Sequence, residues 1–301
     1  MCALFGWLDY KGIVPYRVLK KLTQALANSA EERGTDAAGI SYIHDGKVII
    51  FKRPKPAHKI HFNAPAETKA IMGHTRLATQ GDKKQNYNNH PFAGYADKEF
   101  AFAHNGVLWN DRDLRKDGVI SNTYIDTDSY IGVQLIEKQG KLNFDSLQYM
   151  AETVEGNFTF TVLDQYNSLY IVKGSNPMYL LHFETIGLYV YASTESIMKK
   201  ALKQLGLHKF ESKRIDTEEG DILCIDKNGI VTRSQYKPKI YRSKYMSWFN
   251  YDDSPYYSMH EEILLAYCGC YRNISNDYYD KGIDITNEVC YTITTPRQDA
   301  V

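Results

Sequence analysis

The sequence predicts an α+β fold in which antiparallel sheets are layered against helices. Strand-like segments occur as adjacent pairs, several of them joined by two-residue turn sequences such as Asp45-Gly46 and Asn228-Gly229. Helix-like segments occur as blocks between these pairs, whereas a parallel sheet would alternate each strand with a helix. With 301 residues, of which 43% are hydrophobic, the chain is long enough to bury a sizeable core.

The first part of the chain predicts one helix among strands. Residues 2–8 are short and apolar, which is typical of a buried strand. Apolar residues at three- and four-residue spacing predict a helix over residues 15–33, with Pro15 in its first turn and Gly34 as its stop. Asp45-Gly46 then predicts a hairpin, and a further apolar run predicts the next strand; these segments are residues 37–42, 47–52 and 69–74.

The middle of the chain predicts a loop, a strand and two helices. Residues 82–89 are polar and indicate a loop, and residues 99–104 indicate a strand that stops at the turn sequence Asn105-Gly106. Two amphipathic patterns follow, and they predict helices over residues 127–138 and 144–154.

The last regular segments predict three more strand pairs and one helix. A helix over residues 194–205 has a threonine at its start and closes at Gly206. The predicted strand pairs are 158–163 with 169–172, 178–182 with 188–192, and 221–225 with 230–232. From about Tyr236 tyrosines become dense and the alternating pattern fades, so we expect a domain over residues 2–235 and a tyrosine-rich C-terminal extension over 236–301.

Composition excludes several classes of protein. The 36 basic and 36 acidic residues balance, which argues against bulk attachment to nucleic acid or to an anionic membrane. No apolar run approaches the roughly 20 residues needed to cross a bilayer, and the N-terminus lacks a secretory signal pattern. Five scattered cysteines are not a disulfide framework and indicate a reducing, cytoplasmic location. Some of them lie near a histidine, but His260, Cys268, Cys270 and Cys290 lack zinc-site spacing, so no metal is expected.

The first two residues can form a catalytic nucleophile. Removal of Met1 would leave Cys2 with both a thiol and a free α-amine. The amine titrates at roughly 7.7–8.0 and the thiol near about 8.5, so one residue can supply nucleophile and base. A cysteine before an apolar run is by default a small buried hydrophobic residue. The Met1-Cys2 dipeptide alone does not decide between a catalytic and a structural cysteine.

Other segments offer the remaining parts of such a site. Arg76, expected just past a strand end, could bind a carboxylate bidentately. Asn105-Gly106 offers an amide donor and an open backbone N–H for an oxyanion, or is an ordinary turn. Asp126 could accept an ammonium group or cap a helix, and Arg33 could simply close the first helix.

Taken together and in order, these motifs resemble the class II glutamine amidotransferases. The family shares an N-terminal-nucleophile glutaminase domain, found in glucosamine-6-phosphate synthase, amidophosphoribosyltransferase and asparagine synthetase, and the arginine loop is most similar to that of the first. The resemblance covers residues 2–235 and rests on Cys2, Arg33-Gly34-x-Asp36-x-Ala38-Gly39, Gly73-His74-Thr75-Arg76-x-Ala78-Thr79, His90-Pro91, His104-Asn105-Gly106, Asp126-Thr127-Asp128, Gly174 to Pro177, Ala192-Ser193-Thr194-Glu195 and Glu219-Gly220-Asp221.

The resemblance implies a four-layer αββα fold with two antiparallel sheets, and a glutaminase reaction without metal or organic cofactor. Cys2 would attack the side-chain amide of L-glutamine, with Asn105 and Gly106 holding the oxyanion. Ammonia would leave, and a γ-glutamyl thioester would be hydrolysed to glutamate. Further roles are implied for the substrate pocket and for support of the nucleophile: Arg76 for the α-carboxylate, Asp126 for the α-ammonium, Thr79 and Gln80 in the pocket, and Arg33 beside Cys2.

The chain departs from the family pattern at several positions. Ala3 stands where glycine is usual, Leu77 replaces an aromatic residue, and Gln80 replaces a histidine. About 66 residues follow Gln235, without a phosphate-binding glycine loop, which is too short for a synthase module. We therefore expect the ammonia to pass to a separate acceptor enzyme, and an oligomer is possible.

Two other interpretations stay open. The protein could be an N-terminal cysteine hydrolase of another amide, which would not need both Arg76 and Asp126. It could also be a non-catalytic regulatory or binding subunit, which a retained Met1 would favour.

Overall fold

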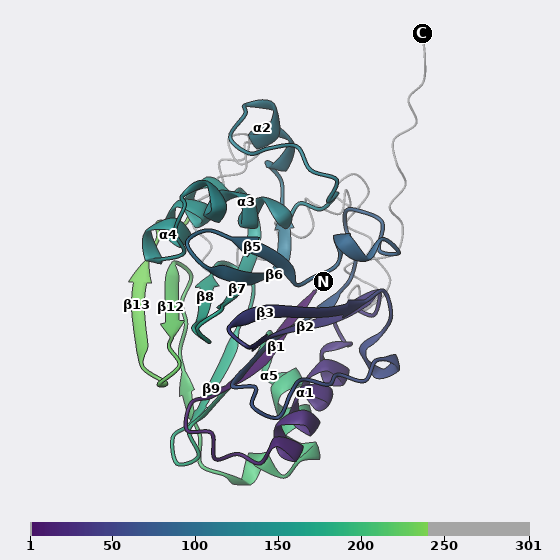
Figure 1. The fold of residues 1–301 in the computed structure, drawn as a ribbon, viewed down its shortest axis with the longest axis vertical. Coiled ribbons are helices and arrows are strands. Elements are labelled where there is room, and N and C mark those ends of the chain that lie inside the picture. The colour runs from purple at the N-terminus through teal and green to yellow at the C-terminus, as the bar shows by residue number, and fades with distance from the viewer. Residues whose placement is uncertain (1, 240–301) are drawn as a thin grey trace, which may run out of the picture. The chain divides into compact units, whose positions relative to one another are not determined.

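The structure is a computed structural model that describes residues 2–239, and these residues form four layers (Figure 1). Two antiparallel sheets stack face to face in the middle, and helices cover the outer face of each. Three clusters of buried apolar side chains fill the three spaces between the layers. The predicted α+β, αββα architecture with two antiparallel sheets is therefore confirmed.

The first sheet contains seven strands and has the N-terminal strand at its centre. Its neighbours are residues far along the chain, since Phe5 pairs with Ala192 on one side and with Gly73 on the other. In spatial order the strands are β11 (Lys213–Ile215), β9 (Tyr179–Phe183), β10 (Leu188–Ala192), β1 (Ala3–Asp9), β4 (Ala70–Arg76), β2 (Ala37–His44) and β3 (Lys47–Arg53).

The second sheet contains six antiparallel strands, and four of its five pairings join strands that are consecutive in the chain. In spatial order they are β13 (Val231–Gln235), β12 (Asp221–Ile225), β8 (Leu169–Lys173), β7 (Gly156–Asp164), β6 (Glu99–Leu108) and β5 (Phe92–Tyr95).

Two helices cover each sheet. The first sheet is covered by α1 (Tyr16–Ala30) and α5 (Glu195–Gln204), and the second by α3 (Tyr130–Lys138) and α4 (Phe144–Thr153). Short α2 (Asp111–Lys116) and three 3-10 turns lie in connecting segments; the turns are η1 (Ala57–Lys59), η2 (Asn86–Asn88) and η3 (Leu207–Lys209).

Strand β1 is apolar throughout because both of its faces are covered. Phe5 and Trp7 point into the cluster shared with α1 and α5, whereas Leu4 and Leu8 point between the two sheets. All seven residues of the strand are buried. Burying a large apolar side chain contributes roughly 1.5–3 kcal/mol, so this strand anchors the first two layers.

Most local predictions are confirmed, but several element boundaries differ from those expected. The strand predicted over residues 99–104 continues through Asn105-Gly106 to Leu108, because β7 pairs with it along that whole length. The helix predicted from Thr127 begins only at Tyr130, because the segment before it holds the Asp128 carboxylate against the backbone N–H of Leu108, at 2.6 Å. Short elements β5, β11 and α2 were not predicted.

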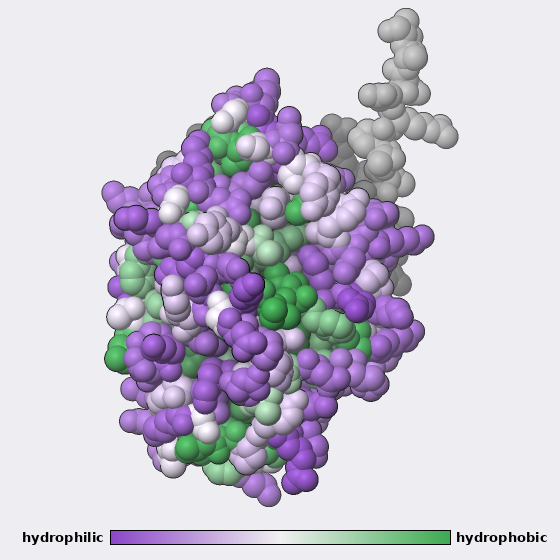
Figure 2. Space-filling model, viewed as in Figure 1, coloured by the Kyte–Doolittle hydropathy of each residue, from purple (hydrophilic) through white to green (hydrophobic). Residues whose placement is uncertain are grey.

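The face shown in Figure 2 is largely hydrophilic, with apolar surface gathered over the β2–β3 hairpin, where Val48 to Phe51 are half-buried. Among residues 2–239, no helix combines the length and apolarity needed to cross a membrane.

The regular segment expected at 259–270 lies outside the described residues. The boundary expected after Gln235 stays a prediction, although Tyr236 packs in the core and donates its hydroxyl to the Lys173 carbonyl at 2.9 Å.

Candidate active site

Cys2 lies buried directly before the central strand β1. Its Sγ donates to the carbonyl oxygen of Leu77 at 3.5 Å, and its own carbonyl accepts a hydrogen bond from Nε of Arg33 at 2.8 Å. Burial raises the pKa of the Cys2 thiol, while the Leu77 contact and the positive charges of the N-terminus and Arg76 act in the opposite direction. The predicted nucleophile and its predicted supporting arginine are therefore in contact.

Two of the departures from the family pattern lie beside Cys2. Ala3 is fully buried, and its methyl group packs in the cluster under α1, so the alanine is accommodated. Leu77 has a side chain that is 43% exposed, and only its backbone carbonyl contacts the cysteine.

Arg76 is the last residue of β4 and is not in the loop that follows, so the expected position just past a strand end was wrong. The strand extends because Arg76 itself pairs with Ala37 of β2. Its guanidinium is 3% exposed and donates from Nη1 to Oδ1 of Asn89 at 2.7 Å. Nη2 donates to the carbonyl of Gln80, and to that of Gly81 at 3.2 Å. The arginine is thus held against the loop that follows it.

The other predicted substrate residues border that loop. Gln80 donates from Nε2 to a carboxylate oxygen of Asp111 at 3.1 Å, and Thr79 is exposed. Gly81 has φ +76° and lies so close to Asp126 that an added Cβ would be 1.9 Å from the Asp126 carbonyl oxygen. The Asp126 side chain is exposed. Gly81 therefore contacts the guanidinium of Arg76 through its carbonyl and lies against the backbone of Asp126.

The predicted oxyanion donors lie inside strand β6. Asn105 is 1% exposed, and its backbone carbonyl accepts from Nδ2 of Asn176 at 2.8 Å. Gly106 has φ +150°, and an added Cβ would lie 1.8 Å from the carbonyl oxygen of Asn157. This position therefore requires glycine because the backbone of β7 passes too close for any side chain.

Three buried histidines, His74, His90 and His104, form what we call the imidazole cluster behind these residues. The rings of His74 and His90 have centroids 4.1 Å apart, and Nε2 of His74 contacts the His104 carbonyl at 2.9 Å. Neither ring nitrogen of His90 has a partner among the described residues. Burial lowers the pKa of all three, that of His74 to about 3, so the cluster is uncharged at neutral pH.

Two further residues were given no role from the sequence, although Ser193 lies in the quoted motif Ala192-Ser193-Thr194-Glu195. Asn89, which holds Arg76, belongs to the polar stretch that was expected to be an ordinary loop, yet it is fully buried. Ser193 follows β10 and is also fully buried; its hydroxyl contacts both Leu4 and Asn105. Both contacts join residues distant in sequence, and no local pattern signals them.

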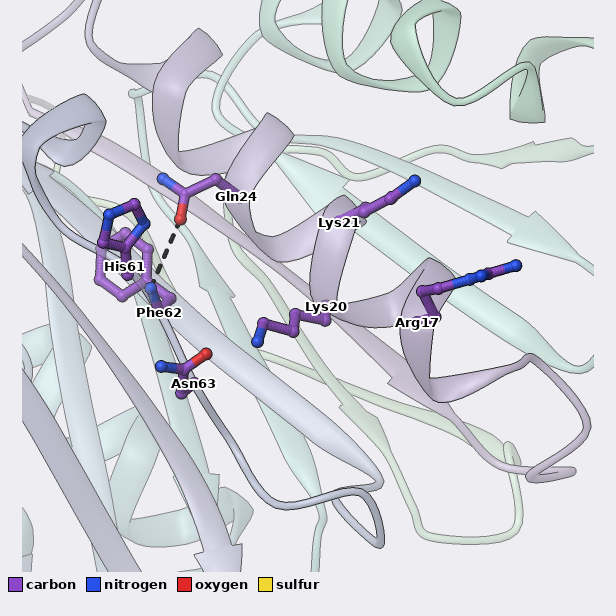
Figure 3. Close-up of a pocket in the computed structure, with 7 residues that line it drawn as sticks. All are labelled: Arg17, Lys20, Lys21, Gln24, His61, Phe62 and Asn63. Atoms are coloured by element: carbon purple, nitrogen blue, oxygen red, sulfur yellow. Dashed lines mark hydrogen bonds between the residues drawn. The ribbon is translucent and has the colours of Figure 1, made fainter.

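A surface pocket of about 640 Å³ lies on α1 and shares no residue with the Cys2 site. In Figure 3, Lys20 extends toward Asn63, whereas Arg17 and Lys21 extend the other way, so its cations do not converge on one point. Within residues 2–239, no cluster of potential metal ligands occurs. The cysteines and histidine considered above for zinc lie outside the described residues.

Comparison with known proteins gives two family matches and several relatives. The class-II glutamine amidotransferase model matches residues 1–131, and a second glutamine amidotransferase domain model matches residues 74–200. The chain is 31% identical over 174 residues to the glutamine–fructose-6-phosphate aminotransferase of Chlamydia trachomatis, covering 55% of this chain and 27% of that protein. It is 27% identical over 250 residues to the same enzyme of Staphylococcus aureus, covering 80% of this chain and 40% of that protein. The chain thus spans less than half the length of these relatives.

A solved structure supports the fold. Glutamine phosphoribosylpyrophosphate amidotransferase from B. subtilis superposes with a TM-score of 0.60 at 21% identity, covering 80% of this chain and 50% of that one. Both family models and the architecture agree with the resemblance drawn from the sequence motifs. The chain therefore contains a class II glutamine amidotransferase domain, which the class-II model matches over residues 1–131.

Proposed function

We propose that this chain is a glutaminase that releases ammonia from L-glutamine, with Cys2 as its N-terminal nucleophile. The observation that carries the proposal is the environment of Cys2. The thiol contacts the Leu77 carbonyl in the loop that follows Arg76, and the Cys2 backbone is held by Arg33. Both the thiol and the backbone of Cys2 are therefore fixed in place, as a preorganised nucleophile requires.

In the proposed reaction, the thiol proton of Cys2 moves to its own α-amine, directly or through a water, and Sγ bonds to the amide carbon of glutamine. Nδ2 of Asn105 and the N–H of Gly106 hold the resulting oxyanion. Collapse of this tetrahedral intermediate breaks the C–N bond. The α-amine returns its proton to the leaving nitrogen, which departs as ammonia. Water then attacks the γ-glutamyl thioester, which gives glutamate and restores the thiol.

The substrate's charged ends define its orientation in this proposal. Arg76 binds the α-carboxylate and Asp126 the α-ammonium, and both residues lie against Gly81. Thr79 and Gln80 complete the pocket. A free amino acid requires both charges at once, which distinguishes this pocket from that of an acyl amide hydrolase.

As the consumer of the ammonia we propose a separate acceptor enzyme, with residues 236–301 as an extension of the glutaminase domain. The supporting observation is that residues 236–301 themselves contain no phosphate-binding glycine loop. Identification of the protein that co-purifies with the full chain tests this part; recovery of the chain without any synthase would contradict it.

The decisive test uses the full chain with its N-terminus established by intact mass. We expect glutamine hydrolysis and covalent labelling by a glutamine-analogue diazoketone, both lost in Cys2→Ala. Cys224→Ala is the matched control, because Cys224 is also a buried free cysteine, and it should keep both activities. Absence of hydrolysis and labelling in a chain that begins at Cys2, with and without candidate partners, would refute the proposal. A retained Met1 would favour the non-catalytic interpretation.

Substrate identity is tested with Arg76→Ala. For glutamine we expect a large rise in KM, because a buried carboxylate partner is lost. An equal effect on acyl amides without an α-carboxylate would contradict the assigned role and favour hydrolysis of another amide.

A further inference from the structure

Ser193 connects the strand of the nucleophile with the predicted oxyanion donor. The residue follows β10 and is fully buried. Its hydroxyl accepts the backbone N–H of Leu4 at 2.8 Å, and its own N–H donates to the Leu4 carbonyl at 2.8 Å. The same hydroxyl lies 3.4 Å from Nδ2 of Asn105. One side chain therefore touches β1 two residues after Cys2 and the only amide in the proposed oxyanion site.

The two ends of the Asn105 amide differ in their surroundings. Nδ2 faces Ser193, whereas Oδ1 is buried and has no partner among residues 2–239. An amide can rotate by half a turn and exchange the positions of its oxygen and nitrogen, which are nearly identical in shape. A buried polar atom without a partner costs roughly 1–3 kcal/mol, and in the present orientation that atom is an acceptor, which would repel a substrate oxyanion placed there.

Rotation of the Asn105 amide would exchange the end that bonds Ser193 with the end that has no partner. A hydroxyl can donate as well as accept, and no described residue takes the Ser193 proton in the present orientation. After rotation, Ser193 donates to Oδ1 and still accepts from Leu4. Nδ2 then occupies the end that now lacks a partner, which is the end available to a substrate oxyanion.

We propose that Ser193 is a positioning residue for the reaction, because its hydroxyl sets the Asn105 amide with Nδ2 toward the oxyanion. This inference rests on the proposed glutaminase function. Without the hydroxyl, Asn105 populates both orientations, and one of them directs a partial negative charge at the oxyanion. Ser193 does not touch the substrate.

The first test is Ser193→Ala, measured by glutamine hydrolysis. We expect kcat to fall roughly 10- to 100-fold, less than the 10²–10³ typical of deleting an oxyanion donor outright. KM should change less than about twofold, because the oxyanion forms only after the substrate has bound. Ser41→Ala is the matched control: Ser41 is also fully buried in the first sheet, and its hydroxyl donates to the Met72 carbonyl at 3.4 Å. It should keep wild-type kcat.

A double-mutant comparison separates positioning from a general structural effect. In an Asn105→Ala background, removal of the Ser193 hydroxyl should change kcat by less than about twofold, because the group it orients is gone. Independent, multiplicative effects would overturn the inference, since Ser193 would then act through Leu4 alone. Equal losses in Ser193→Ala and Ser41→Ala would overturn it as well.

A second variant tests the inference if Ser193→Ala does not fold. Ser193→Cys keeps a similar volume with a weak donor, and wild-type kcat in that variant would overturn the inference. Failure of the wild-type chain to hydrolyse glutamine or to be labelled refutes the proposed function itself. An active wild type with an unaffected Ser193→Ala refutes only the role of Ser193.

Discussion

The imidazole cluster makes the stability of this domain sensitive to mild acid. In the unfolded chain a histidine titrates near about pH 6.5. In the folded chain burial lowers the pKa of His74 to about 3 and that of His90 well below its ordinary value. Below pH 6.5 the unfolded state therefore binds protons that the folded state does not. The stability that depends on these neutral histidines is fully present above pH 6.5. It is lost as the pH falls from 6.5 toward 3.

The size of the effect follows from proton linkage. One pH unit corresponds to about 1.36 kcal/mol per proton, so each histidine that stays neutral in the fold costs about 2 kcal/mol between pH 7 and pH 5. His74 and His90 together cost about 4 kcal/mol on this scale, and His104 acts in the same direction. This is a large share of the roughly 5–15 kcal/mol that stabilises a domain.

His90→Phe isolates one of these contributions. The ring stacks on His74 and meets Phe92 edge to face with centroids 4.5 Å apart, so a phenyl ring suits the site, and both ring nitrogens lack partners among the described residues. We expect the variant to be at least as stable as wild type at pH 7. Its loss of stability between pH 7 and pH 5 should be about 2 kcal/mol smaller.

The assay is urea unfolding followed by tryptophan fluorescence at pH 5, 6 and 7, with the free energy extrapolated to water at each pH. His208→Phe is the control, because it makes the same replacement at an exposed histidine. Equal losses of stability in His90→Phe and wild type would contradict this prediction, since His90 would then bind its proton in the folded state. Destabilisation of His90→Phe by more than about 2 kcal/mol at pH 7 would show that its nitrogens are hydrogen-bonded after all.

Two further predictions concern the candidate site. Gly106→Ala should lower the free energy of unfolding by roughly 3 kcal/mol or more, because its Cβ would lie 1.8 Å from a carbonyl oxygen of Asn157. Gly140→Ala, at φ +67° with open space around it, is the control in thermal melting and should cost about 1 kcal/mol; equal melting temperatures would contradict the steric argument. Asn89→Ala should raise KM for glutamine about tenfold with a smaller change in kcat, because a charge-assisted bond to Arg76 worth roughly 1.5–3 kcal/mol no longer fixes the guanidinium. Steady-state kinetics check this, and an unchanged KM would mean that the loop carbonyls alone hold Arg76.

Local chemistry made parts of the fold predictable. The Asp45-Gly46 turn has φ of 49° and 70°, the left-handed pair that the sequence predicts for a hairpin. Thr194 caps α5 by accepting the N–H of Ile197 at 3.3 Å, and Gly206 closes the segment with φ +70°. These features depend on a few neighbouring residues, which is why the sequence reveals them.

Long-range pairing decided what could not be predicted. Asn105-Gly106 has the composition of a turn, but β7 pairs with it on its whole length and keeps it in a strand. Asn89 has the composition of a solvated loop, but its partner Arg76 is brought to it by β4. The family motifs nevertheless identify Cys2, Arg76 and Asp126 as predicted site residues. Hydrophobic periodicity alone could not identify them, because it reports only which faces are buried.

The central position of β1 also bears on the order of events during synthesis. This strand is synthesised before the strands that flank it, and the register pairs Phe5 with Ala192, so one flanking strand comes from the second half of the chain. Such non-local pairing is slow to form, and a nascent chain that lacks β10 leaves an apolar strand with an unpaired edge. A chain that stops before Leu188 would have the Cys2 thiol but no β10 beside β1. The predicted nucleophile, Cys2, is thus translated well before the strand that completes the sheet around it.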